Sequence, residues 1–220
     1  MEQQNKLKES TLGFFHDLFD LMVVNWLWIL CCIPVITIGP ATCGLYSVTL
    51  KLARDEPVNP AKEFFQSVKR NFKAGLVLEL AAVLPLVVAA GDFWFAMNQE
   101  GFASSLYFAL AAVAVMLCLS LVSYAFALQA MFRNTLKGQI ANAFKLAFIA
   151  PGRTIALWLI LLLPVISLVA LPPVVLKPLG FLYILAGISG PVYGACFVLR
   201  NIFDRVSGAS AAQPLPTSEE

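Results

Sequence analysis

The sequence predicts an all-α, polytopic transmembrane helical bundle with five or six crossings and two cytoplasmic amphipathic helices. Three observations lead to this fold class. Hydrophobic residues make up 60% of the 220 residues and charged residues only 13%, against roughly a quarter charged in soluble domains. Five apolar blocks are each long enough for a bilayer crossing, which needs about 20 helical residues. The loops between them alternate between strongly basic and nearly free of basic residues.

The apolar blocks are candidate membrane crossings joined by polar loops. They cover roughly residues 19–53, 75–97, 102–132, 154–176 and 179–203. Loops 51–73 and 133–153 are rich in lysine and arginine, whereas the turns between them hold almost none. Because cytoplasmic loops retain basic residues, we expect both basic loops and the C-terminus to lie on the cytoplasmic side of a bacterial plasma membrane.

One domain accounts for nearly all of the chain. We expect residues 1–206 to form a single transmembrane helical domain, and residues 207–220 to form a small, polar, disordered tail. The N-terminus includes acidic residues such as Glu2 and Asp17 where a secretory signal would be basic and then apolar. We therefore expect the N-terminus to be retained.

The first block is too long for one straight crossing. Residues 19–54 as a helix would extend about 54 Å, against about 30 Å of hydrocarbon. Pro34 disfavours a helix running through it, and a proline directly after Gly39 suits the first turn of a new helix. A hairpin of residues 15–35 and 40–54 gives six crossings and a cytoplasmic N-terminus. One bent helix gives five crossings and places the N-terminus outside.

Each basic loop contains an amphipathic helix. In the first, Asn59 can cap a helix that Pro60 opens. Its apolar face carries Ala61, Phe64, Phe65, Val68 and Phe72, and the opposite face carries Lys62, Lys69 and Lys73. We expect the phenylalanines to face lipid or the bundle, and the lysines to face anionic headgroups.

Two short similarities suggest a degenerate internal repeat. With an offset near 80 residues, ANAFKLAF in the second basic loop aligns with AKEFFQSV in the first. Residues 188–191 (ISGP) precede a helix that ends at a basic residue, as residues 37–40 (TIGP) do. Such repeats are common in transporters, and also in membrane proteins that transport nothing.

Two features inside the apolar blocks are candidate binding elements. Glu79 is the one acid clearly within a block. Either it lies at headgroup depth and pairs with a lysine such as Lys73, or it faces the bundle interior and carries a proton or binds substrate. The break at Thr37, Gly39 and Pro40 exposes backbone groups at membrane depth. It is either a kink that lets helices pack closely, or the wall of a cavity into which a helix N-terminus points.

The remaining titratable and aromatic groups are expected at the membrane interfaces. His16, Asp17 and Asp20 enter the first block, and the aromatic residues at positions 26, 28 and 93–95 suit interfacial anchoring, with sugar stacking as the alternative. The five cysteines form no metal-binding pattern, and no catalytic motif is present. We therefore expect no enzymatic activity, no cofactor and no metal site. The net charge of +2 does not indicate nucleic-acid binding.

The first third of the chain combines a break containing proline and glycine with a basic helix rich in phenylalanine. The pattern is carried by Asn25, Trp28, Pro34, Thr37, Gly39, Pro40, Lys51, Leu52, Phe64, Phe65, Lys69, Asn71 and Phe72. Over about residues 13–75 it resembles the opening of the YesL family of small bacterial membrane proteins of unknown function. Genes of this family often lie beside genes for carbohydrate ABC-transporter permeases and glycan degradation, and no activity is established for the family. The resemblance therefore implies a link to carbohydrate utilisation but no particular activity.

Two main hypotheses of function follow. The first is a non-enzymatic accessory of a carbohydrate-uptake or glycan-utilisation system, with the lipid bilayer and an ABC-transporter permease or other membrane protein as partners. Its docking surface for the partner or anionic lipid would comprise Lys62, Phe64, Phe65, Lys69, Arg70, Phe72 and Lys73. The alternative is a small transporter or channel in its own right that binds its substrate with Thr37, Gly39, Pro40 and Glu79. A third hypothesis is a lipid- or envelope-organising protein.

Overall fold

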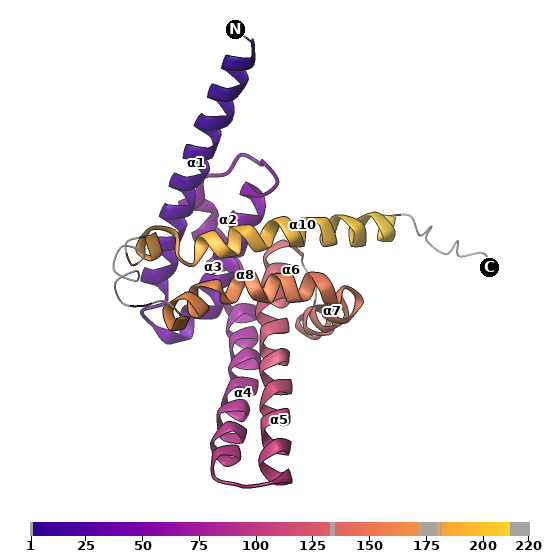
Figure 1. Cartoon of the computed structure of the whole chain (residues 1–220). Helices are drawn as coiled ribbons and strands as arrows, with labels where there is room; N and C mark the ends of the chain where they lie inside the picture. Colours follow the sequence, from indigo (N-terminus) through magenta and orange to yellow (C-terminus); the bar gives the residue numbers. More distant parts are fainter. Residues whose placement is uncertain (1, 133–134, 171, 173–179, 181, 212–220) are drawn as a thin grey trace, which may run out of the picture.

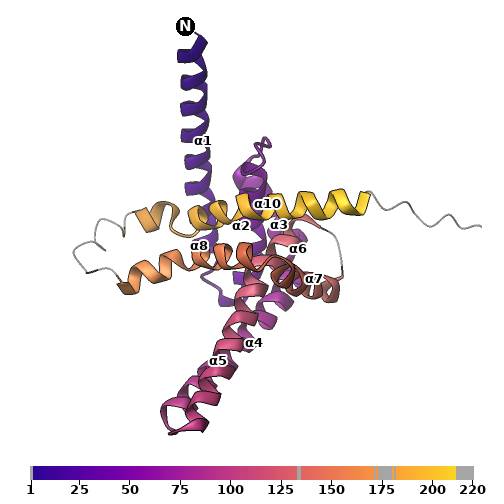
Figure 2. The ribbon, with the colours of Figure 1, turned by 45° about the vertical axis from the view of Figure 1, so that its right-hand side comes forward.

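The computed structural model describes residues 2–132, 135–170, 172, 180 and 182–211 (Figure 1). Every element in these ranges is a helix, which confirms the all-α class. The resulting molecule has a central group of helices, from which α1 and a long helical hairpin project in opposite directions (Figures 1 and 2).

The first apolar block folds back on itself. Helix α1 (Glu2–Cys31) is followed by the short 3₁₀ helix η1 (Val35–Thr37) and by α2 (Ile38–Leu52), which returns beside α1 (Figures 1 and 2). The indole N–H of Trp28 donates to the hydroxyl oxygen of Thr42 at 3.3 Å, a contact that one bent helix could not make across 14 residues. The Thr37 hydroxyl donates to the Pro34 carbonyl at 2.7 Å and fixes the turn. Of the two alternatives for this block, the structure has the hairpin.

The next two helices lead into the long hairpin. Helix α3 (Pro60–Arg70) is short and begins where the sequence predicts, with the Asn59 side chain accepting the Lys62 N–H at 3.1 Å. Helices α4 (Phe72–Met97) and α5 (Phe102–Ser120) then form the hairpin. A π-helical turn, η2 (Leu121–Ala125), continues α5 into α6 (Phe126–Met131). Large apolar side chains are exposed along both α4 and α5, as expected of helices that contact lipid.

The last part of the chain packs across the base of this hairpin. Helix α7 (Leu136–Ile149) meets α8 (Pro151–Ala170) at a bend of 107°. Helix α10 (Ser189–Ala211) lies beside α8 (Figures 1 and 2) and packs against α2. The thiol of Cys196 in α10 donates to the Thr49 hydroxyl in α2 at 3.3 Å, and Arg54, just after α2, pairs with Asp204 at 2.8 Å.

Helix α2 is the centre of the bundle. In Val35–Leu52, which comprises η1 and α2, 67% of the residues are buried, whereas the most apolar stretches of 18 residues within Phe72–Met97 and Phe102–Met131 are only 22% and 28% buried. Helices α1, α3, α4, α6 and α10 all pack against α2. The core is therefore built around the helix that follows the Gly39-Pro40 break.

Three helical segments in the described residues are long and apolar enough to cross a membrane: Val35–Leu52, Phe72–Met97 and Phe102–Met131. The bent pair of α7 and α8 would be a fourth. This is fewer than the five or six crossings expected. A turn at residues 187–188 interrupts the final block, residues 179–203.

Helix α10 extends through Ala211, so the boundary expected near residue 207 falls inside a helix. Small residues such as Ser, Gly and Ala permit a helix to continue even where nothing packs on it, although glycine weakens it. Residues 212–220 lie outside the description, and the disorder expected for them stays a prediction.

Candidate functional site

A cavity of about 440 Å³ lies beside the Gly39-Pro40 break. Residues of α1, η1, α2, α4, α5, η2, α6, α8 and α10 line it, so nearly every apolar segment contributes. Its volume is within the range of small-molecule sites, roughly 300–1,000 Å³. The cavity is thus a candidate binding site at the centre of the fold.

The segments that line the cavity are irregular where they reach it. Val35 comes from the 3₁₀ break before α2, Val122 from the π-helical turn, and Pro164 from inside α8. Ile188 comes from the turn before α10. Irregular backbone within a membrane is tolerated only where it is buried in protein or lines a cavity, and π-turns occur frequently at functional sites. Four helix irregularities therefore share one space.

Glu79 and the break meet at this cavity, although 40 residues separate them. The Gly39 N–H, in the first turn of α2, donates to Glu79 Oε2 at 2.9 Å. The first N–H groups of a helix have no partner within the helix, and the positive end of its dipole favours an anion. Glu79 therefore caps α2 from α4. Within the described part of the chain its carboxylate has no ion pair, so the interpretation as a lysine partner does not hold.

Not all four predicted binding residues reach the cavity. Gly39 and Glu79 line it, whereas Thr37 and Pro40 do not. The Thr37 hydroxyl is engaged by carbonyls of the preceding turn, those of Cys31 and Pro34. Pro40 is buried at the start of α2. That Gly39 and Glu79 bind a ligand stays a prediction.

The break also brings two helices into close contact. A Cβ atom on Gly39 would lie 2.2 Å from the Gly75 carbonyl oxygen, and one on Gly75 would lie 2.6 Å from the Pro40 nitrogen. Both distances are well below van der Waals contact, so α2 and α4 cross where neither helix has a side chain. The sequence left two interpretations of the break open: a kink that lets helices pack closely, or the wall of a cavity. The structure contains both the close packing and the cavity wall.

A buried side chain caps α10 in the way that the partly buried Glu79 caps α2. Asn25 of α1 is fully buried. Its Oδ1 accepts the N–H groups of Ile188 and Ser189, both at 3.2 Å, and its Nδ2 donates to the Ile184 carbonyl at 2.9 Å. We did not predict this role. The available signal was an amide inside an apolar block, because a buried amide needs partners.

The other polar groups of the cavity wall are engaged by the protein. The Trp28 indole donates to Thr42, whose hydroxyl donates to the Ile38 carbonyl at 2.7 Å. The Tyr46 hydroxyl donates to the Val122 carbonyl at 3.3 Å. No lysine, arginine or histidine is among the described lining residues. The cavity is an apolar space whose wall carries one carboxylate.

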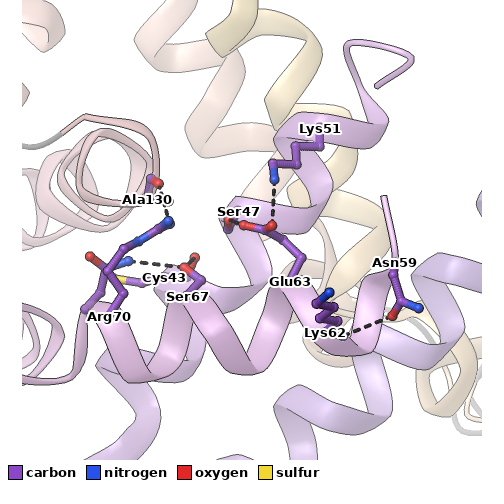
Figure 3. Close-up of polar contacts among 10 residues, drawn as sticks. Cys43, Ser47, Lys51, Asn59, Lys62, Glu63, Ser67, Arg70 and Ala130 are labelled. Carbon is purple, nitrogen blue, oxygen red and sulfur yellow. Dashed lines mark hydrogen bonds and ion pairs between the residues drawn. The ribbon is translucent and has the colours of Figure 1, made fainter. Parts of the chain in front are cut away.

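Helix α3 is fixed to α2 by a set of polar contacts (Figure 3). Glu63 accepts hydrogen bonds from Lys51 at 2.6 Å and Ser47 at 2.5 Å, and the Ser67 hydroxyl donates to the Cys43 carbonyl at 3.2 Å. Burial raises the pKa of Glu63, but the hydrogen bonds from Lys51 and Ser47 outweigh it and hold the pKa below its ordinary value. Glu63 is therefore an ionised anchor of α3.

The predicted apolar face of α3 divides in two. Phe64 is fully buried against Gly44, where an added Cβ would lie 2.9 Å from its ring, so it is a core residue with no surface to offer a partner. Phe65 and Phe72 are 52% and 39% exposed. The basic residues Lys62, Lys69, Arg70 and Lys73 are exposed, with the Arg70 guanidinium donating to the Ala130 carbonyl at 3.3 Å.

The groups expected at the interfaces divide between surface and interior. Trp94 is 62% exposed near the end of α4, and Trp26 is 45% exposed, as anchors would be. Asp20 is buried, with a carboxylate oxygen 3.2 Å from His16 Nδ1, and Asp17 accepts a hydrogen bond from the Tyr193 hydroxyl. The described residues contain no group of three or more side chains suited to a metal ion.

Comparison with known proteins gives a family match over part of the chain and no activity. A family described as protein of unknown function, DUF624, matches residues 21–93, about a third of the chain. No curated protein and no solved structure matches this chain. The matched segment runs from within α1 to within α4, and so includes the Gly39-Pro40 break, α3 and Glu79.

Proposed function

We propose that this protein is a small membrane transporter whose substrate site is the cavity at the Gly39-Pro40 break. The observation that carries the proposal is the convergence of four helix irregularities on one cavity. Substrate sites of secondary transporters are commonly built from interrupted helices near the bilayer midplane. The transporter or channel hypothesis is thus better supported by the geometry than the accessory hypothesis.

The arrangement of α2 and α10 supports this proposal. Both helices begin at the cavity wall, and their first turns are capped by Glu79 and Asn25, which lie on other helices. Movement of α4 or α1 would therefore change the ends of the helices that border the cavity. In α4 and α8, Pro85 and Pro164 remove backbone hydrogen bonds and give each helix a point at which to bend.

The proposal includes an orientation in the bacterial plasma membrane. The positive-inside rule places the basic loops 51–73 and 133–153 and the C-terminus in the cytoplasm. The hairpin of α1 and α2 supports a cytoplasmic N-terminus as well, because a single bent helix would place it outside.

Accessibility of the cavity from the two sides of the membrane tests the transporter proposal without knowledge of the substrate. We would introduce Ala82→Cys, which lines the cavity and is buried, into a cysteine-free variant and label it with a membrane-impermeant thiosulfonate in right-side-out and inside-out vesicles. Labelling from both sides is expected. Leu84→Cys is the matched control, because Leu84 lies two residues further along α4, does not line the cavity and is 66% exposed on the surface of the molecule. Absence of labelling at Ala82→Cys from either side would refute a transport cavity.

The accessory hypothesis is the second candidate, and the fixing of α3 favours it. Contacts of Glu63, Ser67 and Phe64 hold α3 against α2, so three exposed basic side chains, Lys62, Lys69 and Arg70, are presented on a fixed helix. Lys73 follows in the first turn of α4. Such a surface suits an acidic membrane partner, for example a permease of a carbohydrate-uptake system. The cavity itself offers too few polar groups for a sugar, so any link to carbohydrate would come through the partner.

Co-purification after mild solubilisation tests the accessory hypothesis. Replacement of Lys62, Lys69 and Lys73 by glutamate should release a bound membrane partner, because it reverses the charge of the exposed face. Glu56→Lys, at an exposed position before α3, serves as a control for a change of charge elsewhere. Recovery of the wild-type protein with no partner would contradict the hypothesis.

A further inference from the structure

We propose that the cavity binds a lipophilic amine, with the ammonium group at Glu79 and the apolar body against the surrounding helices. This inference rests on the cavity being the substrate site, and it adds the chemical class of the substrate. It follows from the charge, the hydrogen bonding and the shape of the cavity wall.

The charge of the wall selects a cation. Glu79 is the one carboxylate among the described lining residues, and none of them is lysine, arginine or histidine. The positive end of the α2 dipole amounts to about half an elementary charge, which offsets only part of a carboxylate. An ionised group in an apolar environment is costly unless it is paired. A cationic ligand supplies the missing charge, whereas an anionic ligand would be repelled.

The hydrogen-bonding capacity of the wall selects a donor at one position. The polar groups of Trp28, Thr42 and Tyr46 already have partners within the protein. Glu79 Oε2 accepts the Gly39 N–H, and in the described residues its second oxygen has no partner. An ammonium offers three donors, and its hydrogen bonds to a carboxylate are among the stronger ones in proteins. A sugar would leave most of its hydroxyl groups without partners.

The shape and polarity of the remaining wall select the body of the ligand. Apart from the polar groups already described, the wall consists of aliphatic and aromatic residues and a cysteine, including Ala82, Leu86 and Phe126. A volume of about 440 Å³ is enough for a small apolar body. A cage amine such as adamantylamine matches the charge and the size.

Equilibrium binding to the full-length protein in nanodiscs of zwitterionic lipid tests the inference. Adamantylamine, adamantanol and adamantane carboxylate share one body and differ in charge, so their affinities separate the class of ligand from its size. We expect the amine to bind most tightly and the carboxylate most weakly. Glu79→Gln should weaken amine binding about tenfold or more and leave the alcohol unchanged, since it removes a charge-assisted hydrogen bond. Its amide oxygen can still accept the Gly39 N–H.

Two sets of variants separate failure of this inference from failure of the proposed function. Ala82→Phe and Leu86→Phe fill the cavity from α4 and should abolish binding of all three compounds. Unchanged binding in both would show that the cavity is not the site. Glu56→Gln removes an exposed carboxylate and should change nothing. Equal affinity of the wild-type protein for amine and alcohol, an amine affinity unaffected by Glu79→Gln, or no binding of any compound would overturn the amine assignment.

Discussion

Replacing Gly75 with alanine should destabilise the protein because α2 and α4 touch at that residue. The new Cβ would lie 2.6 Å from the Pro40 nitrogen, and a shift of about 0.9 Å is needed to reach an ordinary contact near 3.5 Å. The same shift would stretch the hydrogen bond between the Gly39 N–H and Glu79 from 2.9 Å to well beyond its working range. Overpacking costs about 1–3 kcal/mol and loss of a hydrogen bond to a charged group about 1.5–3 kcal/mol, so we expect about 2.5–6 kcal/mol in all.

Gly91→Ala is the matched control, since Gly91 lies in the same helix and a Cβ there would meet nothing within 4 Å. Alanine is the better helix former, so this variant should be stabilised by up to about 1 kcal/mol. Thermal unfolding of both variants in detergent, followed by tryptophan fluorescence, measures the difference. Equal shifts of Tm for Gly75→Ala and Gly91→Ala would refute the crossing of α2 and α4 at Gly75.

Three further predictions concern the helix ends and α3. Asn25→Leu should lower the free energy of unfolding by about 1–3 kcal/mol in chemical denaturation, because it leaves two buried N–H groups before α10 without an acceptor; an unchanged midpoint would contradict the cap. Phe64→Ala should lower Tm through a cavity that costs about 3–5 kcal/mol, whereas Phe65→Ala, at an exposed position, should have little effect on the same melting curve. The lowered pKa of Glu63 means that its contribution is present above its ordinary pKa and is lost as pH falls through the lowered value. Glu63→Gln should therefore lower the free energy of unfolding by about 1 kcal/mol or less at neutral pH, and it should flatten the acid side of a plot of stability against pH. Lys51→Met should do the same. If the acid side of the plot were identical to that of the wild type, the pair would not contribute.

Helix α3 shows which features could be predicted from the sequence and which could not. Its start at Asn59 and Pro60 and its separation of apolar from basic residues follow from local rules of capping and periodicity. The sequence could not distinguish Phe64 from Phe65, because adjacent residues of a helix lie within the same broad apolar face. Only the position of Gly44 on α2 decides that Phe64 is in the core and Phe65 is at the surface.

The break and Glu79 show the same limit at the candidate site. Each was identifiable alone, since proline after glycine and an acid in an apolar block are both costly in a membrane. Their contact could not be predicted, because it depends on α2 and α4 crossing at two glycines. Asn25 was missed as a cap, because no local pattern connects a buried amide to a helix that begins more than 160 residues later.

The sequence by itself determined that this chain is made of apolar helices, where its first apolar block is interrupted, and which loops are basic. These properties depend on whether each segment can satisfy its own backbone hydrogen bonds and on the balance of apolar and charged residues within about 20 positions. Only the tertiary structure decided that the interruptions share one cavity, that the first block is a hairpin, and that Glu79 meets Gly39 there. Those facts depend on contacts between helices far apart in the chain, and the same local patterns permit many such packings.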